Sequence, residues 1–317
     1  MYHYLQNRIQ EQPLTKKEKN TEYINYFNVA DIIIKVSADL PLTSATFHPK
    51  FKPFKTESPG EEMISIHHSF SLPELKDNDL GQRVYDKPPW KIYKKDDGWL
   101  YIGTYPEQEE EKIFKIARFD NSHTNGHIFH EGKDLFEAGN RTSLTFFPSD
   151  QILLARVLPD RNGCILHSAG LIYKGFGLAF VGHSEAGKST IVKIFKNRSE
   201  ILCDDRNVIR KKPGQDFHLY GTWSHGEVPD ISTAKARLKA LFFLNKSKEN
   251  RIEPVRDRKE ITTRILDCIV KPLVTPDWWD KMITLAYDIS GETPCYDLYF
   301  NKQGGIIKVI DGLLYTT

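Results

Sequence analysis

The sequence predicts an α/β domain with a phosphate-binding loop, preceded by a smaller domain of mainly antiparallel β structure. Two observations carry this prediction. Residues 182–190 read GHSEAGKST, which fits the pattern G-x-x-x-x-G-K-[ST], and they stand between an apolar strand and an amphipathic helix. Upstream, from Tyr26 to about Phe147, short β-type segments alternate with turn residues. With 317 residues the chain is long enough for two domains.

Composition narrows the class of protein. The 44 basic and 42 acidic residues give a net charge of +2, too even for a dedicated nucleic-acid or membrane-surface binder. No apolar run is long enough to span a membrane, and the first twenty residues lack the apolar segment of a secretory signal. The four cysteines lie far apart without a C-x-x-C pair, which is typical of a reducing compartment. We expect a cytoplasmic protein with no nucleic-acid or membrane partner.

We expect a polar tail over residues 1–24 and the β-rich N-terminal domain over residues 25–148. Ile32–Val36 is a β-branched run, and apolar residues alternate with others along 64–70. The segments 90–93 and 99–102 predict a hairpin around an Asp97-Gly98 turn. Ile113–Phe119 and the later Asn125-Gly126 predict another hairpin with its turn at that dipeptide.

Residues 149–317 form the expected second domain, with strands and helices in alternation. The strand order around the loop is typical of a nucleotide-binding α/β domain. The expected elements are a helix over 151–158 capped by Ser149-Asp150, strands Cys164–Tyr173 and Gly177–Val181, the loop and its helix, strands Ile201–Cys203 and Leu241–Leu244, and helices near 259–270 and 276–289.

Each fixed position of the loop pattern has a structural role in binding phosphate. Gly182 and Gly187 allow tight turns and a close approach to an anion. The N–H groups of residues 184–188, at the start of a helix, form a nest for phosphate oxygens. Lys188 reaches the β- and γ-phosphates, and the Ser189 hydroxyl is placed to bind Mg²⁺. The predicted nucleotide-binding residues are Gly182, Ser184, Glu185, Ala186, Gly187, Lys188, Ser189 and Thr190.

An acidic pair follows the loop helix directly. Asp204 and Asp205 end an apolar strand 16 residues after Lys188, which leaves room for one helix and one turn. Phosphoryl transfer needs a carboxylate to hold Mg²⁺ and often a second one to activate the nucleophile. The alternative interpretation is a solvated Asp-Asp turn. The segment Asn245–Lys248 is similar to a guanine-reading N-K-x-D, but Lys248 replaces the acid and no D-x-x-G lies upstream of it after the loop, so a GTPase is excluded.

His167, the loop and the acidic pair, in this order, resemble the catalytic domain of HPr kinase/phosphorylase. The sequence is most similar to the small HPr kinase-related kinases, in which a segment such as Gly221–Glu227 follows the acidic pair. This family is related to phosphoenolpyruvate carboxykinases through the same phosphate-loop core. The resemblance spans roughly residues 160–255 and identifies residues 149–317 as a kinase-like P-loop domain.

The resemblance implies an enzyme, an HPr kinase-like phosphotransferase that uses ATP and Mg²⁺ to phosphorylate a hydroxyl. The acceptor is then a protein or peptide serine or a small hydroxylated molecule. Asp205 is favoured over Asp204 as the base, with the other carboxylate near Mg²⁺, and His167 orients the base. Glu227 completes the metal surroundings or contacts the substrate. The implied catalytic residues are Asp205, Asp204, His167 and Lys188, and the implied metal ligands are Ser189, Asp204 and Glu227. Without the resemblance, His167 reads equally as a core histidine and Glu227 as a surface carboxylate.

Some features depart from the family. No Gly-Arg-Asn segment follows residue 227, so neither phosphorolysis nor a hexamer is implied, although a homo-oligomer remains compatible. The β-rich half does not match the family's regulatory domain, so recognition of HPr is not implied. These departures support an alternative, a nucleotide-gated binding module without phosphoryl transfer. Arg206, Arg210 and Arg251 are equivalent candidates for the cation that closes on the transition state.

The cluster His123, His127 and His130 with Asp120 has spacing that suits a metal site on a helix face. Asn125-Gly126 interrupts any such helix, so we do not predict a metal site there.

Overall fold

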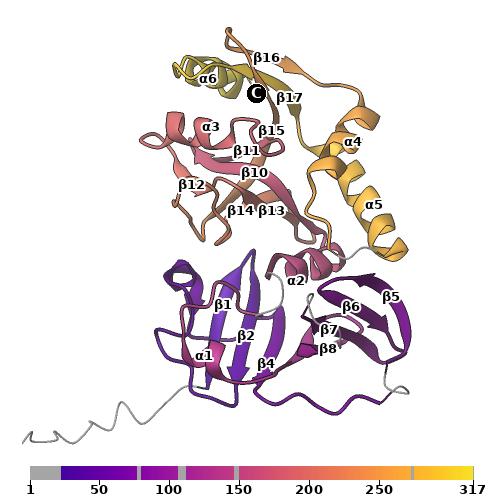
Figure 1. The fold of residues 1–317 in the computed structure, drawn as a ribbon. Helices are drawn as coiled ribbons and strands as arrows, with labels where there is room; N and C mark the ends of the chain where they lie inside the picture. Colours follow the sequence, from indigo (N-terminus) through magenta and orange to yellow (C-terminus); the bar gives the residue numbers. More distant parts are fainter. Residues whose placement is uncertain (1–22, 77–79, 106–111, 146–149, 273–274, 317) are drawn as a thin grey trace, which may run out of the picture.

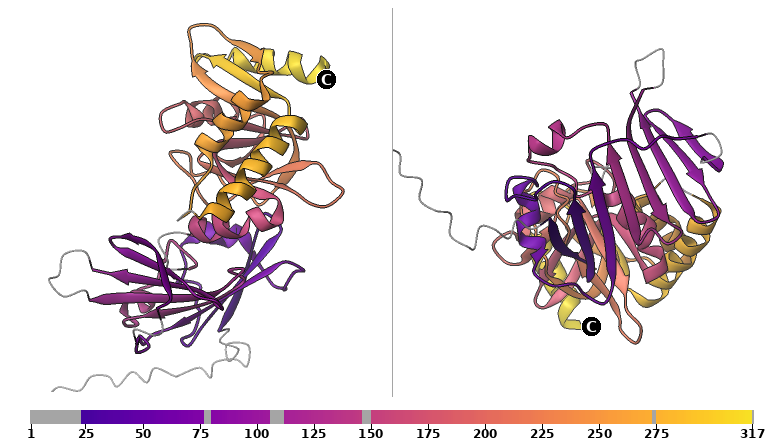
Figure 2. Two further views of the ribbon diagram at one scale, coloured as in Figure 1. Left: turned by 90° about the vertical axis from the view of Figure 1, so that its right-hand side faces the viewer. Right: turned by 90° about the horizontal axis from the view of Figure 1, so that it is seen from below.

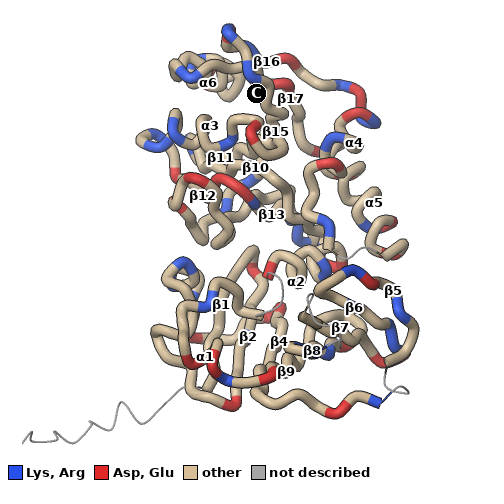
Figure 3. Tube along the Cα trace, viewed as in Figure 1, with Lys and Arg blue, Asp and Glu red and all other residues tan. Residues whose placement is uncertain are grey.

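The computed structural model describes residues 23–76, 80–105, 112–145, 150–272 and 275–316, and it contains two β-sheets with helices (Figure 1). Most of the predicted tail, residues 1–22, lies outside the described residues, but Ile24 already belongs to the first strand. None of the helices in the described ranges is both long and apolar enough to cross a membrane. Basic and acidic residues are interspersed over both halves of the chain (Figure 3).

The N-terminal half forms a nine-stranded sheet in the order β3-β1-β2-β4-β9-β8-β7-β6-β5. Six of its eight strand pairings are antiparallel, while β4 pairs in parallel with both β2 and β9, so the sheet is mixed. Its elements are β1 (Ile24–Val29), β2 (Ile32–Ala38), η1 (Pro49–Phe54), β3 (Lys55–Thr56), β4 (Met63–Ser69), β5 (Gln82–Lys87), β6 (Trp90–Lys94), β7 (Gly98–Thr104), β8 (Ile113–Asp120), β9 (Asn125–His130) and the short α1 (Asp134–Glu137).

Two predicted turns in this sheet are wrong. The β6–β7 hairpin forms, but its corner is at Asp96 and Asp97, and Gly98 is the first residue of β7. The β8–β9 hairpin turns at residues 121–124, and Asn125-Gly126 begins β9. Both glycines are therefore strand residues.

The second half forms an eight-stranded sheet in the order β11-β10-β13-β14-β15-β17-β16, with β12 beside β10. Because β15 also pairs in parallel with β11, strands β11, β10, β13, β14 and β15 form a closed ring of pairings. The strands are β10 (Gly163–Tyr173), β11 (Phe176–Val181), β12 (Glu200–Cys203), β13 (Arg206–Lys211), β14 (Phe217–Tyr220), β15 (Lys235–Lys246), β16 (Arg251–Pro254) and β17 (Cys295–Phe300).

Helices cover both faces of the strands around β11 and β15 (Figure 1). Along β11, Ala179 and Val181 pack in one apolar cluster with α4 and α5, whereas Leu178 and Phe180 pack in another with α3 and α6. Strands buried on both faces read as continuous apolar runs, which is how this region appears in the sequence. The helical elements are α2 (Asp150–Val157), η3 (Pro159–Arg161), α3 (Lys188–Phe195), α4 (Arg258–Cys268), α5 (Pro276–Glu292) and α6 (Ile306–Thr316).

The cap predicted for α2 takes a different form. Ser149 lies outside the described residues, and Asp150 is the first residue of the helix. The Asp150 carboxylate accepts hydrogen bonds from the backbone N–H groups of Leu144 and Thr145, at 3.0 and 2.9 Å, and from the Ser143 hydroxyl. It therefore ties α2 to the segment that leaves the N-terminal sheet.

One apolar core continues across residue 148. It contains the inner face of the N-terminal sheet together with Ile165, Val208, Tyr220 and Trp223 from the second half. Further views show the N-terminal sheet as a layer beside this second half (Figure 2). The buried Arg210 adds polar contacts across the same boundary, because its guanidinium donates to Glu62 and to the Ala30 carbonyl.

Candidate functional site

The predicted site residues meet at one edge of the second sheet. Strands β11, β15 and β17 are parallel, and β12 runs in the same direction because both β11 and β12 are antiparallel to β10. Their carboxyl ends therefore share an edge, which is where open α/β sheets bind ligands. A pocket of about 540 Å³ lies there, and the predicted residues that line it are His167, Ser184, Glu185, Gly187, Lys188, Ser189, Thr190, Asp204, Asp205 and Glu227.

The loop after β11 needs its two glycines. Gly187 has a φ of +106°, and a Cβ there would come within 2.7 Å of the Phe300 ring. A Cβ on Gly182 would lie 2.5 Å from the Ala186 Cβ. Glu185 also adopts a positive φ, of 66°. Gly182 and Ala186 support this turn from behind and do not line the pocket.

Lys188 begins α3 and is almost fully buried. Its ammonium donates hydrogen bonds to the carbonyls of Gly182 and His183, both at 2.8 Å, so it lies across the loop. Burial lowers the pKa of Lys188, and the nearby carboxylates of Asp205 and Asp204 oppose that shift. The arrangement holds a cation beside the position where the loop would receive an anion.

Asp204 is the buried member of the acidic pair, at 1 % exposure. Its Oδ2 accepts hydrogen bonds from the Ser189 hydroxyl and the Val228 N–H, both at 2.9 Å. Its Oδ1 accepts from the Gly226 N–H at 2.5 Å. Asp204 therefore joins the start of α3 to the segment that follows β14.

Asp205 is the accessible member, with 24 % of its side chain exposed. His167 Nδ1 lies 3.8 Å from Asp205 Oδ1, and Arg206 Nη1 lies 3.0 Å from Asp205 Oδ2. Burial raises the pKa of Asp205, but His167, Arg206 and Lys188 outweigh this effect, and the pKa lies below the usual value. An ionised carboxylate thus faces the pocket between an imidazole and a guanidinium.

Glu227 lies at the rim. Its side chain is 73 % exposed, and its carboxylate forms an ion pair with Lys193 at 3.1 Å. The neighbouring Gly226 approaches Asp204 so closely that a Cβ there would lie 3.2 Å from the Asp204 carboxylate. Within the described residues, no group of three or more His, Cys, Asp or Glu side chains is arranged to hold a metal ion.

Two cations of the pocket were not singled out by the sequence: Lys246 and Lys302. Lys246 ends β15 and Lys302 follows β17, so both stand at the carboxyl ends of parallel strands. Only the strand order shows that these two lysines reach the pocket, because no local sequence pattern distinguishes them from other lysines. Of the three arginines considered, Arg206 lines the pocket, whereas Arg210 is bound to Glu62 and Arg251 stacks on Tyr299.

The histidines of the N-terminal sheet have separate partners. His123 bonds to the Tyr101 hydroxyl at 2.7 Å, His127 to the Ser69 hydroxyl at 2.8 Å, and His130 to His68 at 3.0 Å. These contacts place the three imidazoles in different surroundings.

Comparisons with known proteins find one family model that matches part of the chain and a distant structural similarity. A family model described as the SynChlorMet cassette protein ScmC matches residues 149–271, a range that includes the loop and the acidic pair. Among solved structures, the HPr(Ser) kinase/phosphatase from Coxiella burnetii is similar over 48% of this chain and 88% of that chain. The sequence identity is 10% and the TM-score 0.30, so the structural relationship is distant. No curated protein matches the chain.

Proposed function

We propose that the protein is an ATP- and Mg²⁺-dependent kinase that transfers the γ-phosphoryl group to a hydroxyl of a protein or peptide serine or of a small molecule. In this proposal residues 149–317 form a P-loop α/β domain, and residues 25–148 form a β-rich N-terminal domain that shares an apolar core with it. One observation carries the proposal: the Ser189 hydroxyl is bonded to the buried Asp204, while the accessible Asp205 stands beside it in the same pocket.

The donor set fits a magnesium nucleotide. Mg²⁺ prefers oxygen ligands and commonly binds one or two carboxylates plus substrate phosphates, and the Ser189 hydroxyl and the Asp204 carboxylate are such ligands. Bound Mg²⁺ would supply charge neutralisation at the phosphates. Glu227 is the further predicted ligand. Lys188, Lys246 and Lys302 would balance the charge of a triphosphate from three different elements.

Asp205 acts on the acceptor in this mechanism. As the acceptor oxygen bonds to the γ-phosphorus, the bond from that phosphorus to the bridging oxygen breaks, ADP leaves, and the hydroxyl proton passes to the Asp205 carboxylate. His167, whose Nδ1 lies 3.8 Å from that carboxylate, would orient it. Arg206 contacts the same carboxylate and is the arginine nearest to the charge that develops during transfer.

Asp205→Asn tests the base. We expect phosphoryl transfer from labelled ATP to fall by about 100-fold or more, because a positioned base contributes that much, while ATP affinity measured by calorimetry stays within a few-fold. The matched control is Asp216→Asn, which removes a carboxylate whose side chain is 60% exposed and away from the pocket. Undiminished turnover in Asp205→Asn would contradict the proposed role.

A second candidate is a nucleotide-gated binding module in which the β-rich half recruits a partner without transfer. The favouring observation is the segment Trp223–Val228. Its Trp223 contacts Phe51 of η1 in the N-terminal half, and its Gly226 and Val228 contact Asp204. Incubation of the protein with labelled ATP and cell extract distinguishes the two. Label on an acceptor that depends on intact Lys188 supports the kinase, whereas ATP binding without any label supports the module.

A further inference from the structure

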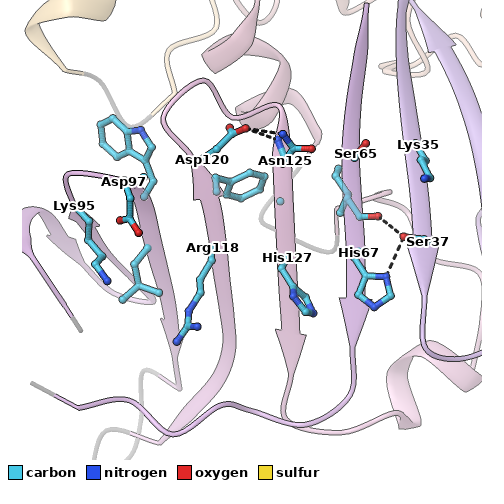
Figure 4. A pocket seen from close by; sticks show the side chains of 16 residues that line it. Lys35, Ser37, Ser65, His67, Lys95, Asp97, Arg118, Asp120, Asn125 and His127 are labelled. Atoms are coloured by element: carbon cyan, nitrogen blue, oxygen red, sulfur yellow. Dashed lines mark hydrogen bonds between the residues drawn. The ribbon is translucent and has the colours of Figure 1, made fainter. Parts of the chain in front are cut away.

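A groove of about 530 Å³ lies on the N-terminal sheet, far along the chain from the pocket described above (Figure 4). Its floor follows the strand register: Ser37 on β2 pairs with His67 on β4, His67 with His127 on β9, and His127 with Arg118 on β8. These residues alternate with Val36, Ile66 and Ile128, which belong to the apolar core. Because successive strand residues point to opposite faces, the groove lies on the face turned away from the core.

The carboxylates of this groove are held by internal partners. Asp120 accepts hydrogen bonds from the N–H groups of Thr124 and Asn125 and from their side chains, as the dashed lines to Asn125 in Figure 4 show. Asp39, beside the groove, bonds to His67 at 2.9 Å. Asp97 is the exception: it lies near Lys95 at the β6–β7 turn, and the described residues include no ion-pair partner for it (Figure 4).

Two of the remaining cations have no carboxylate partner in the described part of the chain, although the Arg118 guanidinium lies over the Phe129 ring, 5.7 Å from its centroid. Among the described residues, no carboxylate lies within ion-pair distance of Lys35 or Arg118, and both side chains line the groove. Burial lowers the pKa of His127, and the neighbouring His67 and Arg118 lower it further, although Asp39 acts in the opposite direction. The positive charge of the groove is therefore available to a ligand, while most of its negative charge is not.

The spacing of the two cations indicates the size of the ligand. Lys35 stands on β2 and Arg118 on β8, which are three strand spacings apart in the order β2-β4-β9-β8. At about 4.8 Å per spacing, that is roughly 14 Å across the strands. Lys35 is in register with Ser65 and Asn125, whereas Arg118 is in register with His127, two residues further along β9, so the diagonal separation is roughly 16 Å, too far for one small anion. An extended peptide rises about 3.3 Å per residue, so acidic residues four positions apart lie roughly 13 Å apart and face the same side, and the long lysine and arginine side chains can span the remaining distance. Between the cations lie Ser65, Asn125 and His127, which offer hydrogen bonds to a peptide backbone.

We propose that this groove binds an acidic peptide segment in extended conformation, with carboxylates four residues apart paired to Lys35 and Arg118. The peptide crosses β4 and β9 and uses their polar side chains for its backbone groups. This inference rests on the N-terminal sheet alone and is independent of phosphoryl transfer.

Fluorescence anisotropy with the full-length chain tests it. The probe is a labelled Gly/Ser peptide with glutamate at every fourth position, compared with the same peptide carrying glutamine. We expect the glutamate peptide to bind more tightly, and Lys35→Gln or Arg118→Gln to weaken it about five- to tenfold. The matched control is Lys87→Gln, which removes one charge from an exposed position on β5 and leaves affinity within twofold. Added salt weakens binding because the pairs are near the surface.

Three results would overturn the proposal. Equal affinity for the glutamate and glutamine peptides would show that charge pairing does not contribute to binding. An equal loss in Lys87→Gln and Arg118→Gln would show a diffuse electrostatic effect in place of a groove. Tighter binding of a labelled oligonucleotide or of anionic vesicles, lost in Arg118→Gln, would assign the groove to another class of partner. A peptide with its glutamates adjacent binds more weakly than the spaced peptide if the four-residue spacing is right.

Discussion

At the scale of single residues, Phe119 explains two glycines that the sequence assigned to turns. A Cβ on Gly98 would lie 2.1 Å from the Phe119 carbonyl oxygen, and a Cβ on Gly126 would lie 2.3 Å from the Phe119 ring. Both positions are in strands that pair with β8. Dipeptides with glycine predict hairpin turns because glycine accepts a positive φ. Here glycine is required for space, and a local pattern does not distinguish the two reasons.

Alanine substitutions at these glycines should differ in cost. Gly98→Ala meets a backbone atom that no rotamer change can move, so we expect it to lower the free energy of unfolding by about 3 kcal/mol or more. Gly126→Ala meets a side chain that can shift, so about 1–3 kcal/mol is expected. Urea denaturation measures both. Gly132→Ala is the control, because a Cβ there has no atom within 4 Å.

Phe119→Leu in the Gly126→Ala background should recover part of the loss, since it shortens the side chain that clashes. The same change should not rescue Gly98→Ala, whose clash is with the backbone. If Gly98→Ala and Gly132→Ala are equally stable, the close contact with Phe119 does not determine the residue at position 98.

The site residues that the sequence predicts are determined by local spacing, whereas those it misses are determined by contacts between distant segments. Lys188, Ser189 and the acidic pair fall within a short stretch whose spacing is set by one loop and one helix, so a pattern finds them. Lys246 and Lys302 reach the pocket because β15 and β17 lie beside β11. Strand order depends on pairing between distant segments, and residue spacing does not encode it.

At the scale of elements, the segment after β14 links the two sheets. Trp223 is 3 % exposed, and its ring packs edge-on against Phe51 and Phe54 of η1, with ring centroids 5.1 and 5.2 Å apart. Three to five residues later, Gly226 and Val228 donate backbone hydrogen bonds to Asp204. The N-terminal sheet therefore helps to fix the buried carboxylate of the candidate metal site.

Trp223→Ala should uncouple the N-terminal half of the chain from the Asp204 carboxylate. We expect it to lower the free energy of unfolding by about 3–5 kcal/mol, as for other buried tryptophans. It should also reduce the factor by which Mg²⁺ strengthens ATP binding, because the backbone N–H groups that donate to Asp204 are then no longer held in position. Calorimetry with and without Mg²⁺ gives this factor, and Trp223→Phe should retain most of it.

Trp279→Ala is the matched control, since Trp279 on α5 packs against the apolar cluster that contains α4, α5 and one face of β11. It should lose stability without changing the effect of Mg²⁺. An unchanged Mg²⁺ factor in a folded Trp223→Ala protein would show that this segment does not position Asp204.

Many elements were predictable in type and order, but β13, β14, β16, β17 and α6 were not predicted, and neither were the strand pairings. Apolar periodicity and turn residues located β10, β11, α3, β12, α4 and α5 within a few residues. The parallel pairings of β4 with β2 and β9, and of β15 with β11, join segments separated by many residues. The alternation of residue types is the same for parallel and antiparallel partners with one buried face, so it leaves these choices open.

At the scale of the whole molecule, three buried histidines make stability depend on pH. His68, His123 and His130 are 0, 4 and 8 % exposed. Because a carbonyl only accepts, His68 donates from Nε2 to Leu144 and accepts at Nδ1 from His130 Nε2, at 3.0 Å in both cases. A proton added at His68 Nδ1 would oppose the donor of His130. With His130 as the donor, this network is therefore satisfied only while the His68 ring is neutral.

Acidification should therefore destabilise the fold in a defined range. Burial, assisted by Arg156 for His123 and by Lys115 for His130, lowers both pKa values from 6.5 to about 3. Between these values the unfolded chain binds more protons than the folded chain, so stability is complete above pH 6.5 and is lost as the pH falls toward 3. The loss is about 1.4 kcal/mol per pH unit for each histidine, or about 2 kcal/mol each by pH 5. Urea denaturation at pH 7 and pH 5 measures this loss.

His123→Gln removes one of these groups. The stability that this variant loses between pH 7 and pH 5 should therefore be smaller by about 2 kcal/mol than the loss in the parent protein. The control His225→Gln changes an exposed histidine and should lose as much stability as the parent protein. Equal losses in all three proteins would mean that His123 takes up its proton over the same pH range in the folded and unfolded chains, and that its bond to Tyr101 does not require the neutral ring.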